Sequence, residues 1–448
     1  MTIAPTGVWR PPFGWVTAGA VAMVFLAATQ ALAVTTVMPA VSEELDGAGL
    51  YAVAFSGVLA ASVVGMVVVG VWCDRAEPAH ALTLSVALFV LGLVVAGAAP
   101  DMTTLVVGRL IQGLGTGGQT VALYVVVARV YPSELHGRVM AAFSAAWVVP
   151  SLVGPAVAGA VTEYLHWRWV FFGVAALAVI AFTIVYLRLH GTPLRASEVD
   201  TGPYAVRVLC SVVVAVGAVG LSLAGEFGAL APLVAGASLV IVVIAVRPLL
   251  PPGTLTVRRG LPSVVLMRAL IAGALFGAEI YVPYLLVDRY GFSTTFAGFG
   301  LTAAALLWAA GAEVQGRFGD HLGSTRIAVI GVSLLTAATV LAFITAALGL
   351  PPAVVIGGWS LAGAGMGLMY PRLTVLTLAY STPQNQGFNS AALSISDAAG
   401  AAAAIAAMGV AFVALTGSGA AFPAVFLLAA ALALLALVPG LRLSRVSG

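Results

Sequence analysis

The sequence predicts an all-α integral membrane protein with fourteen transmembrane helices. Of its 448 residues, 61% are hydrophobic and only 8% are charged, and the mean hydropathy is +1.11. A water-soluble protein of this length needs far more charge to cover its surface. A helix that crosses a bilayer needs about 20 mostly apolar residues, and the chain consists of such runs almost from end to end.

Fourteen apolar runs can be followed along the chain. The first run follows Arg10 without a small-residue cleavage site, so we expect it to stay in the membrane and not to be removed as a signal peptide. An even number of spans puts both termini on one side of the membrane. The predicted spans are 14–39, 50–73, 79–99, 103–130, 138–163, 168–189, 204–224, 229–247, 262–287, 294–317, 325–347, 352–380, 387–414 and 420–441.

The arginines predict which side that is. All 19 basic residues are arginine. With a cytoplasmic N-terminus, fifteen of them, Arg268 included, fall in cytoplasmic loops or at cytoplasmic span ends. Arg168 and Arg289 then fall outside, and Arg109 and Arg372 fall within spans. Cytoplasmic loops are enriched in basic residues, so we expect both termini in the cytoplasm. The lysine-free composition, rich in alanine, valine, glycine and arginine, suggests a bacterial source, so we expect a multi-pass protein of the bacterial cytoplasmic (inner) membrane.

Two halves of the chain repeat one another. GVWCDRAEPAH matches GRFGDHLGSTR, which pairs Gly70 with Gly316 and Asp74 with Asp320. RLIQGLGTGG in the fourth span also matches WSLAGAGMGL in the twelfth. Both halves start on the same side of the membrane, so they are parallel repeats. Transporters built of two such halves hold their substrate between them near the bilayer midplane.

The repeat divides the chain into three parts. We expect a six-helix bundle in residues 1–189 and a second one in residues 261–448. Residues 190–260 form a linker that carries two extra spans, at 204–224 and 229–247, between polar, proline-rich segments.

Several motifs in these halves resemble signatures of the major facilitator superfamily. The loop after the second span keeps Gly70, Asp74 and Arg75 of a G-x3-D-R-x-G-R-R signature, although its later glycine and arginines are replaced. The fourth span matches R-x2-Q-G-x-G at Arg109 and Gln112. Over nearly the whole chain, the sequence most resembles the fourteen-span branch of drug:proton antiporters.

Two further positions bear on this resemblance. Gly154 and Pro155 in the fifth span are similar to the core of a motif found in exporting members, and this weighs against a nutrient importer. Many members of the fourteen-span branch carry an aspartate in the first span, nine residues before a proline. Here Gln30 occupies that place before Pro39, so we expect any transported proton to be carried elsewhere.

The resemblance implies a secondary active transporter with proton-coupled export of amphipathic or cationic small molecules by alternating access. The alternative is an exporter or flippase of lipids or lipid-linked metabolites. An intramembrane enzyme would need a nucleophile–base pair or a metal cluster within the spans, and neither is present in the sequence. We expect a monomer in the lipid bilayer with a small-molecule substrate, no nucleic acid, no cofactor or metal, and the proton gradient as its energy source.

Ionisable residues within spans are the candidates for proton coupling. Glu279 lies four residues before Pro283 in the ninth span, and Asp397 lies in the middle of the thirteenth. A carboxylate that is neutral in one state and charged in the other can couple proton entry to movement of the halves. Each could instead be a satisfied polar contact or recognise a cation. Arg109 is the third candidate, with bonding to helix carbonyls as its alternative role.

The remaining candidates fall into three groups. The conformational gate comprises Gly70, Asp74, Arg75, Gly316, Asp320, Gly154 and Pro155, in which the resemblance implies a charge relay at Asp74. A structural ion pair is expected between Glu313 and Arg372. Polar and aromatic residues on the expected inner spans predict the wall of an apolar substrate cavity, and they are Gln30, Gln112, Trp147, Phe276, Tyr281, Trp308 and Ser394.

Overall fold

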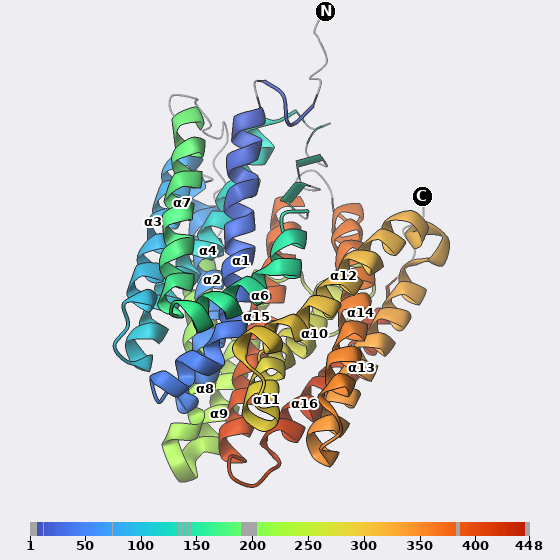
Figure 1. The fold of residues 1–448 in the computed structure, drawn as a ribbon. Coiled ribbons are helices and arrows are strands. Elements are labelled where there is room, and N and C mark those ends of the chain that lie inside the picture. Colours follow the sequence, from blue (N-terminus) through green and yellow to red (C-terminus); the bar gives the residue numbers. More distant parts are fainter. Residues whose placement is uncertain are drawn as a thin grey trace, which may run out of the picture.

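The computed structural model describes residues 7–11, 13–73, 75–132, 135, 138–139, 142–143, 145–189, 204–381 and 386–443. These residues are almost entirely helical and contain no strand. Both ends of the described chain lie at one end of the bundle, which we call the terminal face; the opposite end is the distal face (Figure 1). The helices are α1 Gly14–Glu44, α2 Tyr51–Cys73, α3 Pro78–Gly97, α4 Met102–Val130, α6 Val148–Tyr164, α7 Arg168–Leu189, α8 Tyr204–Ser222, α9 Ala231–Ala245, α10 Leu261–Glu279, α11 Tyr281–Tyr290, α12 Thr294–Leu322, α13 Ser324–Leu348, α14 Pro352–Ala379, α15 Gln386–Ala414, α16 Ala421–Leu435 and α17 Leu437–Gly440.

Twelve helical segments of the described chain are long and apolar enough to cross a membrane, which confirms an all-α, multi-pass membrane protein. Two of the fourteen predicted spans fall short of that standard. The described part of the fifth span is the 17-residue α6, and the eighth span is a shorter apolar helix. The number fourteen therefore stays a prediction.

The two sequence repeats pack in equivalent ways. A Cβ atom on Gly113 or Gly117 of α4 would lie 2.3 Å or 2.0 Å from a carbonyl oxygen of α2, that of Val58 or Ser62. The matching glycines of α14 meet α12 in the same way, since Gly363 and Gly367 approach the carbonyl oxygens of Ala304 and Trp308. Small residues let membrane helices approach closely, because lipid-embedded helices associate through packing and not through exclusion of water.

Substitution of one of these glycines tests the close packing. Gly117→Val is expected to prevent folding, because its Cβ would lie 2.0 Å from the Ser62 backbone oxygen, which cannot move aside without shifting α2. Gly173→Ala in α7 is the matched control, since no atom lies within 4 Å of its added Cβ. Size-exclusion profiles of the two purified variants measure the effect: Gly117→Val should aggregate, and Gly173→Ala should elute as a single symmetrical peak. A monodisperse, thermally stable Gly117→Val protein would contradict the packing.

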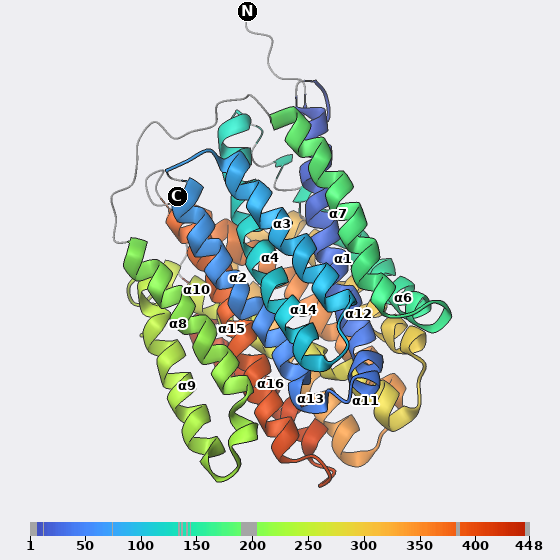
Figure 2. The same cartoon turned by 90° about the vertical axis from the view of Figure 1, so that its left-hand side faces the viewer.

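Helices α1–α7, the N-terminal half, and α10–α17, the C-terminal half, meet along two seams, α2 against α15 and α6 against α12. The extra pair of helices, α8 and α9, lies outside α2 and α15 (Figure 2). In transporters with two such halves, the substrate site lies between the halves near the middle of the membrane. We therefore look for a transport site among the residues between these two halves.

Candidate functional site

The first feature of the site is a break in the helix that opens the C-terminal half. Helix α10 ends at Glu279 and α11 begins at Tyr281. Proline has no N–H, so Pro283 cannot donate a hydrogen bond to the Glu279 carbonyl four residues earlier. Ile280, between the two helices, keeps helical backbone angles (φ −63°, ψ −24°), so the break is a proline kink at which a helix hydrogen bond is missing. The Glu279 carbonyl therefore lacks the helix hydrogen bond that a residue other than proline would supply at position 283.

The Glu279 side chain is partly buried, and no hydrogen bond or ion pair joins its carboxylate to another described residue. An unpartnered charge at the bilayer centre costs about 3 kcal/mol on insertion scales. A carboxyl group in this setting can gain or lose a proton without breaking a protein contact. Its role in proton coupling stays a prediction.

Asp397 has a different environment. Its Oδ1 atom accepts a hydrogen bond from Arg268 Nε at 2.8 Å and a second from the Tyr370 hydroxyl at 2.7 Å. The Arg268 guanidinium also lies over the Tyr370 ring, 3.4 Å from its centroid, and donates to the Tyr370 carbonyl. The pair is largely enclosed, with 14% of the Arg268 side chain and 26% of the Asp397 side chain exposed. Both bonds hold the carboxylate in a fixed orientation between α10 and α14.

Arg268 belongs to this site and not to a span end. We expected Arg268 among the cytoplasmic arginines, but it lies inside α10 and contacts α14 and α15. Aromatic rings surround the pair. Trp308 of α12 meets Tyr370 edge-on, with centroids 5.2 Å apart. Tyr124 of α4, 42% exposed, lies within electrostatic range of both Arg268 and Asp397 from the other half.

The polar residues of α4 donate mainly to backbone oxygens. Arg109 is 3% exposed and bonds to the Ala54 carbonyl of α2 at 3.1 Å and to Gln112 Oε1 at 2.8 Å. Gln119 donates to the Met23 carbonyl of α1. No ion pair joins Arg109 to an acid in the part of the chain that the structure describes. These bonds hold α4 against α1 and α2, which is the alternative role considered for Arg109, and its part in proton coupling stays a prediction.

The predicted cavity residues are not all placed alike. Gln112 and Tyr281 are 3% and 1% exposed, and Gln112 is bonded to Arg109, so neither lines an open space in this structure. Trp147 is 45% exposed, and Phe276, Trp308 and Ser394 are partly buried. Their contact with substrate stays a prediction.

Gln30 is 1% exposed, and both polar atoms of its side chain lack a hydrogen-bond partner. Leaving a buried amide unsatisfied costs about 1–3 kcal/mol. Many members of the fourteen-span branch carry an aspartate at this position of the first span. Here the position holds a buried amide that makes no hydrogen bond in this arrangement of the helices.

The halves are closed at the distal face. Hydrogen bonds between the halves lie there: Tyr51 of α2 donates to the Ile280 carbonyl at 2.9 Å, and the Thr295 N–H donates to Glu163 of α6 at 3.1 Å. Ala52 packs directly against Gly409 of α15, leaving no room for a Cβ atom. The Ile280 carbonyl lies at the break beside Glu279, so closure and the candidate proton site share one stretch of backbone.

Glu163 gives this closure a testable pH dependence. The N–H of Thr295, and then the Ser293 hydroxyl, hold the pKa of the exposed Glu163 carboxyl below its usual value. The contact is therefore at full strength above the usual carboxyl pKa and weakens as the pH falls through the lowered value. Glu163→Gln is expected to weaken closure at neutral pH, and so to raise thiol labelling of an Ala52→Cys probe. Equal labelling in Glu163→Gln and in the Glu43→Gln control would contradict this role.

The predicted gate motifs lie partly outside the described residues. Asp74 and the side chain of Asp320 are not described. Arg75 follows the end of α2, and no atom approaches closely where a Cβ would stand on Gly70 or Gly316. Gly154 and Pro155 lie in α6, and the Pro155 carbonyl faces Gly298 of α12 across the seam between the halves. Their gating role stays a prediction.

The expected ion pair between Glu313 and Arg372 is not the pairing that the structure forms. Glu313, whose side chain is 63% exposed, pairs with Arg317 one turn later at 2.5 Å. Arg372 donates to the Ser324 hydroxyl at the start of α13. An arginine four residues further along the same helix is within reach of a glutamate.

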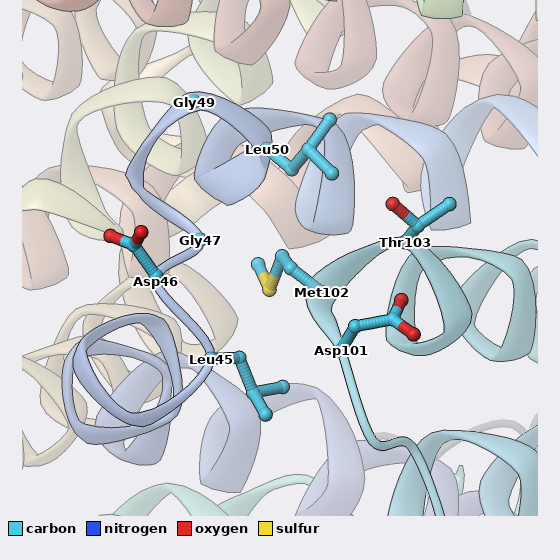
Figure 3. Close-up of a pocket in the computed structure, with 8 residues that line it drawn as sticks. All are labelled: Leu45, Asp46, Gly47, Gly49, Leu50, Asp101, Met102 and Thr103. Carbon is cyan, nitrogen blue, oxygen red and sulfur yellow. The ribbon is translucent and has the colours of Figure 1, made fainter.

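One open hollow lies apart from the space between the halves. The loops before α2 and α4 form it at the distal face, and Figure 3 shows Met102 between Asp46 and Asp101. Asp101 accepts a hydrogen bond from the Thr104 N–H and so caps α4. No group of three potential metal ligands occurs among the described residues. The hollow belongs to one half only and has no evident part in transport.

Named relatives support a transport role. The chain is 30% identical over 428 residues to a "probable multidrug-efflux transporter" of Mycobacterium tuberculosis, a match that covers 88% of this chain and 87% of that protein. It is 21% identical over 294 residues to the "multidrug efflux pump SdrM" of Staphylococcus aureus, which covers 64% of this chain and 65% of the pump. Several other relatives match over less than a third of their own length.

Solved structures share the fold. A bacterial homologue of the human lysosomal transporter Spinster, inward-facing and unoccupied, aligns with a TM-score of 0.65 at 17% identity, over 96% of this chain and 95% of that chain. A peptide transporter of the POT family aligns with a TM-score of 0.70 at 15% identity, over 98% of each chain.

The family model of the Major Facilitator Superfamily matches residues 20–404. As the motifs in both halves indicated, the family and the fold are those of membrane transporters and not of enzymes. The chain belongs to the Major Facilitator Superfamily.

Proposed function

We propose that this protein is a proton-coupled exporter of amphipathic or cationic small molecules that works by alternating access. The observation that carries the proposal is Glu279, a carboxylate without a partner among the described residues, at a helix break between the halves. The multidrug-efflux names of the relatives support the substrate class. In this proposal both termini face the cytoplasm of a bacterium, and a monomer in the inner membrane is driven by the proton gradient without a cofactor.

The two carboxylates would have separate roles. Glu279 has no counter-charge to release when it takes up a proton, so it is suited to carry one. Asp397 is bonded to Arg268 and Tyr370, so proton uptake there would break a protein contact. Its second oxygen makes none of these bonds, and Trp308 and Tyr370 stand beside it. Aromatic faces near a carboxylate attract organic cations, so we assign substrate recognition to Asp397.

Dye transport into proteoliposomes tests the function. The protein is reconstituted, a pH gradient is imposed, and movement of a cationic dye such as ethidium is followed by fluorescence. We expect transport that depends on the direction of the gradient and stops when an ionophore collapses it. If wild-type protein moves no dye under any gradient, the drug-export proposal fails. Co-purified lipid and lipid transport would then be measured to test the alternative substrate class.

A further inference from the structure

The helix pair between the two halves, α8 and α9, has no part in the mechanism described so far. Helix α8 packs against α2 of the N-terminal half and α15 of the C-terminal half, and it contacts α2 more extensively. Figure 2 shows the pair lying along the outside of the bundle, beside α2 and α15. Helix α8 therefore covers the seam at which the two halves must separate if the distal face opens.

One face of α8 is buried along its length. Ser211, Val214, Ala218 and Leu221 recur at helical spacing and are each at most 3% exposed. The opposite face carries Leu209 and Val216, which are 62% and 66% exposed, as expected for side chains in contact with lipid. The buried face is thus shaped to fit the seam.

The contacts of α8 with the two halves differ in kind. Near the distal face, the Ser222 and Ser56 hydroxyls of α8 and α2 lie 2.6 Å apart in a buried hydrogen bond. One helical turn further into the bundle, the small residues Ala218, Ala60 and Ala402 of α8, α2 and α15 form a buried cluster, and this is the contact that α8 makes with α15 there. A directional bond fixes one helix to another, whereas small apolar side chains present a smooth surface along which a helix can shift.

At the terminal face, Arg207 of α8 makes a cation–π contact with the C-terminal half. Its guanidinium lies 5.2 Å from the centroid of the Phe388 ring of α15. A single cation–π contact of this length is a weak interaction. Such a contact can break during each transport cycle, and the buried hydroxyl pair with α2 need not.

We propose that α8 moves as a part of the N-terminal half and slides along α15, so that the α2–α15 seam stays covered while the halves rock. The interaction surface is the α15 face around Ala402, and its partner is α8 of the same chain. The inference rests on the alternating access of the proposed function, but not on the identity of the substrate.

Two disulfides that share helix α8 test it. In a background with Cys73 and Cys210 replaced by alanine, Ser56→Cys/Ser222→Cys joins α8 to α2, and Ala218→Cys/Ala402→Cys joins α8 to α15. Opening of the distal face is followed in both by labelling of an additional Ala52→Cys probe, and dye transport is measured in parallel. Each protein is compared oxidised and after reduction, which controls for misfolding.

We expect the α2–α8 link to leave labelling and transport within about twofold of the reduced protein. We expect the α8–α15 link to lower both by more than about tenfold, about 1.4 kcal/mol of bias, and reduction to restore them. The inference is overturned if the α2–α8 link blocks opening, or if the α8–α15 link does not. Absence of dye transport in the reduced parent, with normal labelling, would instead count against the proposed substrate.

Discussion

Glu279→Gln is expected to abolish transport driven by a pH gradient, with a loss of about 100-fold or more. A factor of 100 corresponds to about 2.7 kcal/mol, close to the cost of an unpartnered charge at the bilayer centre. Glutamine keeps the size and polarity of the protonated side chain but cannot release a proton. Exchange of labelled for unlabelled dye without a gradient should persist, because exchange needs the rocking motion and not proton release.

Glu313→Gln is the matched control for this experiment. Glu313 is an exposed carboxylate in the same half, paired with Arg317 on its own helix. Its replacement should leave gradient-driven transport within about twofold, since exposed ion pairs contribute at most about 1 kcal/mol. Normal gradient-driven transport by Glu279→Gln would remove Glu279 from the mechanism, and equal loss of exchange and driven transport would show a structural defect.

Asp397→Asn is expected to weaken binding of a cationic dye by at least about tenfold, since the loss of one ionic contact with the dye exceeds about 1.4 kcal/mol. It also leaves the largely buried Arg268 without its counter-ion. Breaking a buried pair by removing one partner is strongly destabilising, so the melting temperature should fall as well. Dye titration by fluorescence anisotropy and a thermal melt on the same sample measure the two effects.

A second variant separates recognition from stability. Arg268→Met/Asp397→Leu removes both charges and should recover much of the thermal stability, because an apolar pair of similar size can replace a buried ion pair. It should not recover binding of the cation. Recovery of cation binding by the double variant would show that Asp397 supports the fold and does not recognise the substrate.

The helices, the repeat and the family could be predicted from the sequence because their signals are local. Runs of about 20 apolar residues define spans. The glycines of α4 and α14 recur in step because each must fit against the backbone of a neighbouring helix, α2 or α12. The helix break at Glu279 also has a local cause, since Pro283 lies four residues further on.

The pairings in the site could not be predicted in the same way. Arg268 and Asp397 are 129 residues apart and meet only because α10 packs against α15. Arg268 lies several residues inside its predicted span, 262–287. That depth in the membrane is the signal that could have identified it as a site residue. Tyr51 and Glu163 lie at helix ends, and nothing in the sequence around them predicts a partner. Their bonds to the other half form only because the two halves meet at the distal face. Glu313 failed as a partner for Arg372 because a same-helix arginine was nearer.

The central claim is that Glu279 exchanges a proton for substrate, and substrate-induced proton release tests it most directly. Purified protein in weakly buffered detergent solution is mixed with a saturating cationic dye, and the pH change is recorded with an indicator. Wild-type protein should release protons when it binds the dye, and Glu279→Gln that still binds the dye should release none. Equal release by both proteins, or binding by wild type without any release, would contradict it.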